Sequence, residues 1–130
     1  MIDPAHLIGV WKLVDTRAHD GAGTALPPPY GGNGLGVISF GADGRMVAAL
    51  CQGGELPPGE TREYSSYCGT YSFDGHTLVT HVDATAEPTR MGSDQVRGVT
   101  LENGRIVLRP APRPWRGLMQ HRELIWEKLG

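Results

Sequence analysis

The chain has 130 residues with 12 basic and 14 acidic side chains, and its formal net charge is −2 at pH 7. This length predicts one domain over residues 1–130, and the lack of a basic stripe argues against a nucleic-acid partner. No apolar run approaches the roughly 18 residues that cross a bilayer. The N-terminal segment also lacks the pattern of a signal peptide, so we expect a cytoplasmic protein with no membrane partner.

Short strands separated by turn residues account for most of the chain. One helical turn is expected at residues 4–8, because Asp3 can cap it and Pro4 suits its first position. Strands are then predicted at residues 10–17, 35–40, 45–51, 62–73, 76–83, 95–101, 105–109 and 120–128. The segment 110–117 holds three prolines, which remove backbone donors, so we expect it to stay out of any central strand.

Three dipeptides predict tight hairpins between these strands. Asp43-Gly44, Asp74-Gly75 and Asn103-Gly104 each stand between two apolar runs, and both residues of such a pair tolerate the positive φ of a two-residue turn. Eight antiparallel strands joined mainly by hairpins predict an all-β, up-and-down barrel that closes around one small core or cavity. A two-sheet sandwich stays open as an alternative, because the order of the hairpins does not separate the two folds.

The two cysteines are predicted to be reduced. Pairing the strands on either side of the loop at residues 53–60 sets Cys51 opposite about residue 63, not opposite Cys68. Free thiols in turn agree with a cytoplasmic location.

Seven segments carry a resemblance to a known family. They are residues 7–14 (LIGVWKLV), 36–40 (GVISF), 43–46 (DGRM) and 67–71 (YCGTY), together with residues 80–83 and 92–97 and the C-terminal LIWEK at 124–128. On these segments the chain resembles the bacterial lipocalin-like domain family, a group of calycin-type barrels, along nearly its whole length. The resemblance implies an eight-stranded barrel with an internal cavity, and it implies no particular activity.

The candidate catalytic residues are His81, Arg97, Tyr67 and Tyr71. Tyr67 and Tyr71 share a face of one strand, because side chains alternate along a strand. Counting back from the Asp74-Gly75 turn places His81 opposite Cys68, close to both tyrosines, and Arg97 comes from the next strand. We predict that these four line one cavity, where the imidazole or a phenol moves a proton and the guanidinium holds a carboxylate or enolate.

Structural roles stay open for two of these residues. His81 also suits a hydrogen-bonded core position, and Arg97 also suits pairing with Asp83 or a backbone carbonyl. The face of strand 76–83 that looks inward is open as well, because residues 79, 81 and 83 compete with residues 78, 80 and 82.

Five further residues are predicted to contact a ligand, namely Trp115, Tyr30, Asp15, His121 and Met46. Trp115 is a large ring in a proline-rich segment and suits the rim of the barrel. Tyr30, between prolines and glycines, suits the mouth. Asp15 shares a predicted face with Trp11, a candidate floor residue. His121 begins the last strand, where a solvated position is the alternative, and Met46 lies on strand 45–51.

No cofactor or metal is expected. His76 and His81 are five residues apart on one strand and so point to opposite faces, and no C-x-x-C or H-x-E-x-H pattern occurs.

Two functions stay open for a small, mostly apolar ligand that carries a carbonyl or carboxylate group. The protein either isomerises or cyclises it without a cofactor, or it is a non-catalytic carrier or sensor. A filled barrel that binds nothing is a third possibility, and either a monomer or a homodimer is expected.

Overall fold

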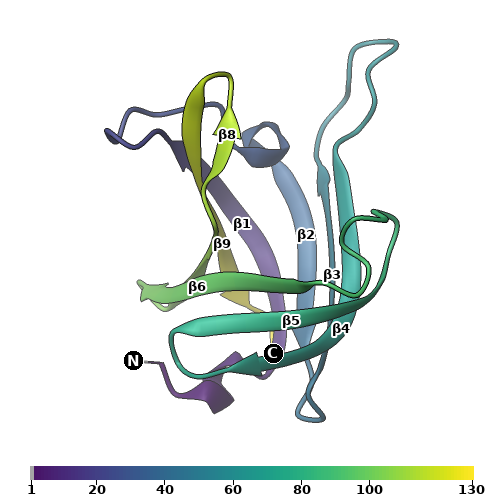
Figure 1. Ribbon diagram of the computed structural model, residues 1–130, viewed down its shortest axis with the longest axis vertical. Helices are drawn as coiled ribbons and strands as arrows, with labels where there is room; N and C mark the ends of the chain where they lie inside the picture. Colours follow the sequence, from purple (N-terminus) through teal and green to yellow (C-terminus); the bar gives the residue numbers. More distant parts are fainter. Residues whose placement is uncertain (1) are drawn as a thin grey trace.

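The computed structural model describes residues 2–130, which form nine strands and two short turns (Figure 1). The strands are β1 (Gly9–His19), β2 (Gly34–Phe40), β3 (Arg45–Gln52), β4 (Tyr64–Phe73), β5 (Thr77–Thr85), β6 (Asp94–Glu102), β7 (Arg105–Pro110), β8 (Arg113–Trp115) and β9 (Leu118–Lys128). The 3₁₀ turns are η1 (Pro4–Leu7) and η2 (Pro29–Gly32). Over these residues, no helical segment has the length and apolar character needed to cross a membrane.

The strands form a closed antiparallel barrel. Each of β1 to β7 pairs with its neighbour in the chain, β7 pairs with β9, and β9 returns to pair with β1. Eight strands therefore close the barrel, so the barrel prediction is confirmed and the sandwich alternative is wrong. The short β8 lies outside this ring and pairs with the start of β9, as expected for the proline-rich segment. The expectation is wrong for Pro110 alone, which ends β7 and lies opposite Arg97 of β6.

Local turn chemistry sets the three predicted hairpins, all of which are present. Asn103 and Gly104 both adopt positive φ, at 53° and 79°, in the turn between β6 and β7. The Asp74 carboxylate accepts hydrogen bonds from the backbone nitrogens of His76 and Thr77, and these bonds lower its pKa. Such side chain to backbone bonds stabilise the turn before any long-range contact forms.

One end of the barrel is closed by side chains. The turn η1 is capped by Asp3, whose carboxylate accepts a hydrogen bond from the backbone nitrogen of Ala5. It places Leu7 against Trp11, whose indole nitrogen donates to the Leu7 carbonyl at 2.9 Å. Trp11 and Leu7 are both fully buried, and Phe40 packs with them in one core. Figure 1 shows this turn at the lower end, while η2 and the β8–β9 hairpin lie at the upper end.

Two register irregularities change which side chains point inward. In β1 the pairing with β9 slips between Leu13 and Asp15, so Thr16 takes the inward position and is buried, whereas Asp15 is exposed. A bulge reverses the side-chain alternation beyond it. The prediction that Asp15 faces the cavity with Trp11 is therefore wrong.

The second irregularity lies in the β4–β5 pair, where Cys68 pairs with Ala84 and Gly69 with Val82, so that Asp83 of β5 is an extra residue. Thr70 lies opposite His81 because the hairpin closes with Phe73 opposite Leu78, two residues farther along β5 than a two-residue turn at Asp74-Gly75 would give. The expected pairing of Cys68 with His81 is therefore wrong. Cys51 pairs with Tyr64, one residue from the expected position. Both cysteines, which lie within the described residues, are free, as predicted.

Candidate functional site

A cavity of about 810 Å³ opens at the end of the barrel opposite η1. This volume is in the range that takes a drug-sized molecule. Apolar side chains cover part of its wall, namely Leu50, Leu108, Leu124 and Trp126, with Pro110 and Ala111 near the β8–β9 hairpin. The polar part of the wall comes mainly from arginine, tyrosine, serine and glutamine side chains, which are Arg90, Arg97, Arg113, Arg122, Tyr30, Tyr67, Ser65 and Gln95.

Arg90 holds one side of this cavity in a fixed arrangement. Its guanidinium donates to Ser65 Oγ at 3.0 Å and to Gln95 Oε1 at 2.7 Å, and it lies 4.6 Å from the ring centre of Tyr67. A guanidinium can only donate, so Gln95 must turn its amide oxygen to Arg90. The amide nitrogen of Gln95 is then left as a buried donor that makes no hydrogen bond of good geometry within residues 2–130. The polar group near it is the Tyr67 hydroxyl, whose pKa the Gln95 side chain lowers.

Arg97 and Arg122 form the second polar group on the wall. Arg97 donates to the carbonyl of Val96 at 3.0 Å, and Arg122 makes a long contact of 3.5 Å to the carbonyl of Ala111. The Nε atom of Arg122 is buried, and no atom of the described residues accepts from it. Among the ion pairs found in residues 2–130, none includes Arg97 or Arg122.

Burial and neighbouring positive charges lower the pKa of both arginines. Burial lowers the pKa of Arg97. Burial, together with the charges of Arg113 and Arg97, lowers the pKa of Arg122 to about 10. Guanidinium groups keep their charge at neutral pH. Arg97 and Arg122 are therefore two of four cations on the wall, with Arg90 and Arg113, that lack a carboxylate partner in the described chain.

Two tyrosines on the wall remain neutral phenols. Burial is the main cause that raises the pKa of Tyr67 and of Tyr30. Tyr30 holds a left-handed backbone conformation, with φ 58° and ψ 30°, which is uncommon for a residue with a side chain. The turn that carries it is tied to the barrel by Thr16, whose hydroxyl donates to the Pro29 carbonyl at 2.8 Å.

Trp126 adds a further donor at the cavity. Its side chain is 1% exposed and lines the wall, and its indole nitrogen has no acceptor among the described residues. The three buried side-chain atoms without a partner, in Gln95, Arg122 and Trp126, therefore all belong to residues of this one cavity.

The structure brings together three of the predicted site residues. Tyr67, Arg97 and Tyr30 line the cavity as predicted. Arg97 does not pair with Asp83, because Asp83 binds Arg45 on the outside of the barrel at 2.8 Å. The backbone carbonyl of Val96 is its partner, which was the other alternative.

Two predicted residues point inward below the cavity. Tyr71 donates its hydroxyl to the Gly41 carbonyl at 2.7 Å and packs edge-on against Phe40, with ring centres 5.1 Å apart. Met46 is 3% exposed and belongs to the core of the closed end. Neither side chain is part of the cavity wall, so the prediction that they share it with Tyr67 is wrong.

Two predicted residues lie on the outside. His81 is exposed, and its Nδ1 lies 2.8 Å from a carboxylate oxygen of Asp94. Of the two competing faces of β5, the inward one carries Leu78, Thr80 and Val82, all of which are buried. His81 therefore cannot reach the cavity, and the prediction that it lines the wall is wrong. His121 stacks on His19 across the β1–β9 pair, with ring centres 5.2 Å apart, and it is absent from the cavity wall as well.

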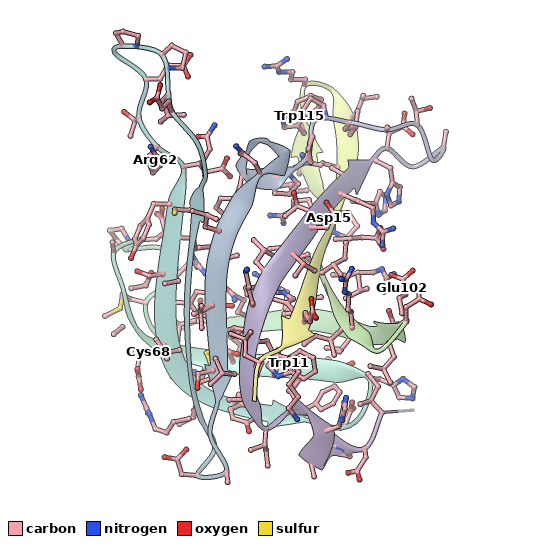
Figure 2. The ribbon with its side chains drawn as sticks, turned by 180° about the vertical axis from the view of Figure 1, so that it is seen from behind. Trp11, Asp15, Arg62, Cys68, Glu102 and Trp115 are labelled. Atoms are coloured by element: carbon pink, nitrogen blue, oxygen red, sulfur yellow. The ribbon has the colours of Figure 1, made fainter. Side chains whose placement is uncertain are left out.

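Trp115 lies at the expected end of the barrel but does not reach the cavity. Figure 2 shows it at the upper end, on the β8–β9 hairpin, and Trp11 toward the lower end. Its ring lies 4.8 Å from the guanidinium carbon of Arg116 and is not part of the cavity wall.

Sequence reasoning missed Arg90, Arg122 and Gln95 as site residues. Arg122 had a usable signal, because it alternates with Leu124 and Trp126 along β9. Gln95 shares a face with Arg97 for the same reason. Arg90 lies in the connection between β5 and β6, where no periodicity exists to predict a direction. Over residues 2–130, no three histidine, cysteine or acidic side chains gather as a metal site requires.

Comparison with known proteins agrees with the architecture. A family model described as a lipocalin-like domain matches residues 8–129, which is nearly the whole chain. No curated protein matches the sequence. A lipocalin-like barrel with an open cavity fits the binding of a small hydrophobic ligand. The chain therefore belongs to the family of lipocalin-like domains.

Proposed function

We propose that this protein binds, inside its barrel cavity, a small and mostly apolar molecule that carries a carbonyl or carboxylate group. The observation that carries the proposal is the set of three buried donors without a partner, in Gln95, Arg122 and Trp126, on the wall of one open cavity. Buried donors are costly when unpaired, by about 1–3 kcal/mol each, so an acceptor on a ligand offsets that cost. The apolar side chains beside them provide the contact surface for the rest of the molecule.

A cavity-blocking variant tests this proposal. Ser65 lines the cavity from β4, and Ser72 is exposed farther along the same strand. We expect 8-anilinonaphthalene-1-sulfonate, an apolar anion, to bind the native protein with enhanced fluorescence. We expect Ser65→Trp to weaken this binding at least tenfold because the indole fills the space, and Ser72→Trp to leave it unchanged.

The melting temperature of each variant shows whether the barrel stays folded. Equal binding to the native protein and to a folded Ser65→Trp protein would place the probe outside the cavity. That result would contradict the proposal.

A second candidate is a cofactor-free isomerisation or cyclisation of the bound molecule. The observation that favours it is the juxtaposition of Tyr67 and Arg97 on the wall, where the guanidinium charge acts on the pKa of a phenol that burial keeps protonated. These two groups suit the stabilisation of an enolate oxygen, an intermediate that such reactions share.

The enolisation step can be measured by itself. In deuterated water, solvent hydroxide removes a proton next to the carbonyl of bound 2-tetralone, and deuterium returns to the same carbon. We expect the native protein to accelerate this exchange, measured by NMR, and Tyr67→Phe to lose about 100-fold, the typical effect of one oxyanion donor. His81→Ala is the control, because His81 lies outside the barrel. No acceleration by the native protein would leave only the binding function.

A further inference from the structure

The charge on the cavity wall is unbalanced in favour of cations. Arg97 and Arg122 reach the wall without a carboxylate partner in the described chain. The acidic residues that border the cavity, Glu63, Glu87 and Asp94, are all exposed. Asp94 is engaged by His81 at 2.8 Å, and Glu87 accepts from the Thr89 hydroxyl at 3.1 Å. The less exposed part of the wall is therefore positive.

The unpartnered groups are all of one kind. Gln95 Nε2, Arg122 Nε and Trp126 Nε1 are N–H donors, and no side-chain acceptor on the described wall is left buried without a partner. A neutral carbonyl offers a single oxygen. A carboxylate offers two oxygens with about four acceptor positions and matches a guanidinium in plane and charge.

Arg90 explains why the amide of Gln95 belongs to this group. Because Arg90 occupies Gln95 Oε1 at 2.7 Å, the amide atom of Gln95 that is left without a partner is the donor Nε2. The same arginine is already satisfied by Ser65 and Gln95 and lies over Tyr67, so it acts as a positioning residue. The residues left to bind the anion are Arg97, Arg122 and Gln95.

We infer that the ligand is an organic acid, whose carboxylate is held by Arg97, Arg122 and Gln95 and whose apolar body lies against Leu108, Leu124 and Trp126. The inference rests on the proposed function and specifies the chemical class of its ligand. Binding supplies the negative charge that the two arginines lack within the described chain. The free energy of that pairing favours the acid over a neutral molecule of the same shape.

Matched pairs of acids and amides test this inference by titration calorimetry. Suitable pairs are benzoate with benzamide, 2-naphthoate with 2-naphthamide, and decanoate with decanamide. We expect the acid to bind at least tenfold more tightly than its amide in each pair that binds. We expect Arg97→Met to reduce acid binding to the level of the amide, with little effect on the amide.

Arg105→Met is the matched control, because Arg105 is an exposed arginine that pairs with Glu127 outside the cavity. It should keep the preference for the acid. Equal binding of acid and amide by the native protein would overturn the inference and leave the proposed function standing. If 2-naphthalenesulfonate binds and none of the carboxylates does, the ligand is an oxyanion of another class. Binding of no member of any pair would contradict the proposed function, and the inference would fall with it.

Discussion

Arg122→Met is expected to make the unliganded protein more stable, by about 1–2 kcal/mol, or roughly 3–8 °C in melting temperature. The native guanidinium is partly buried near Arg97 and Arg113 and lacks a carboxylate partner in the described chain, so its charge opposes folding. Methionine has a similar length and no charge. The expected gain in the free energy of unfolding is modest because solvent reaches part of the Arg122 side chain and screens its charge.

The direction of the pKa shift sets the pH range of this effect. Arg122 has a folded-state pKa of about 10, which is below the ordinary value of an arginine side chain. The unfolded chain therefore binds more protons between these two values, and the penalty in the native protein is relieved only as pH rises through that range. At any pH below about 9 the penalty is complete. The gain from Arg122→Met should accordingly be the same at pH 6 and at pH 8.

The same substitution should weaken the binding of an organic acid at least tenfold. A substitution that raises stability and weakens ligand binding indicates that the native residue serves function rather than folding. Arg105→Met, which removes an exposed ion pair with Glu127, should change stability by less than about 0.5 kcal/mol. Thermal unfolding followed by circular dichroism checks both variants. A lower melting temperature for Arg122→Met would show that Arg122 supports the barrel and would remove this argument for its role.

Gly69→Ala is expected to be the most damaging small substitution in the barrel, with a loss of about 3 kcal/mol or more. A Cβ at Gly69 would overlap the backbone carbonyl oxygen of His81, and it would lie 2.8 Å from the carbonyl carbon and 3.2 Å from Val82 Cα. These are backbone atoms of β5. They cannot move aside without opening the β4–β5 pair at its register shift.

Gly98→Ala is the matched control for this prediction. Gly98 also lies within a strand, β6, but the nearest atoms to an added Cβ belong to Arg109, at 3.9 Å or beyond. It should unfold within about 1 kcal/mol of the native protein. Urea unfolding measures both variants, and the yield of soluble protein reports on Gly69→Ala if it does not fold. Equal stability of the two variants would contradict the close approach of β4 to β5.

Short-range chemistry explains what the sequence predicted correctly. The hairpins at Asp43-Gly44, Asp74-Gly75 and Asn103-Gly104 depend on residues within the turns themselves, such as the Asp74 carboxylate that accepts from two backbone nitrogens. The three hairpins gave the antiparallel order of neighbouring strands, whereas the choice of a barrel over a sandwich depended on the pairing of β9 with β1. The alternation of side chains along β4 predicted that Tyr67 and Tyr71 share a face, but it did not predict that only Tyr67 reaches the cavity.

Other features of the site depended on tertiary structure. The bulge after Leu13 turns Asp15 outward, and the β4–β5 hairpin, which closes with Phe73 opposite Leu78, sets His81 opposite Thr70. Both rows of β5 carry side chains able to face a core, so only packing against the other strands decided that Leu78, not His81, points inward.

The sequence by itself determined the eight barrel strands, the turns between them and the reduced cysteines, because each follows from residues close together in the chain. Only the closed barrel decided that Arg90 reaches from the β5–β6 connection to Ser65 and Gln95, and that Arg97 and Arg122 meet at one cavity. Contacts between strands distant in sequence depend on bulges, register and closure. These are properties of the whole sheet, and no local pattern of residues encodes them.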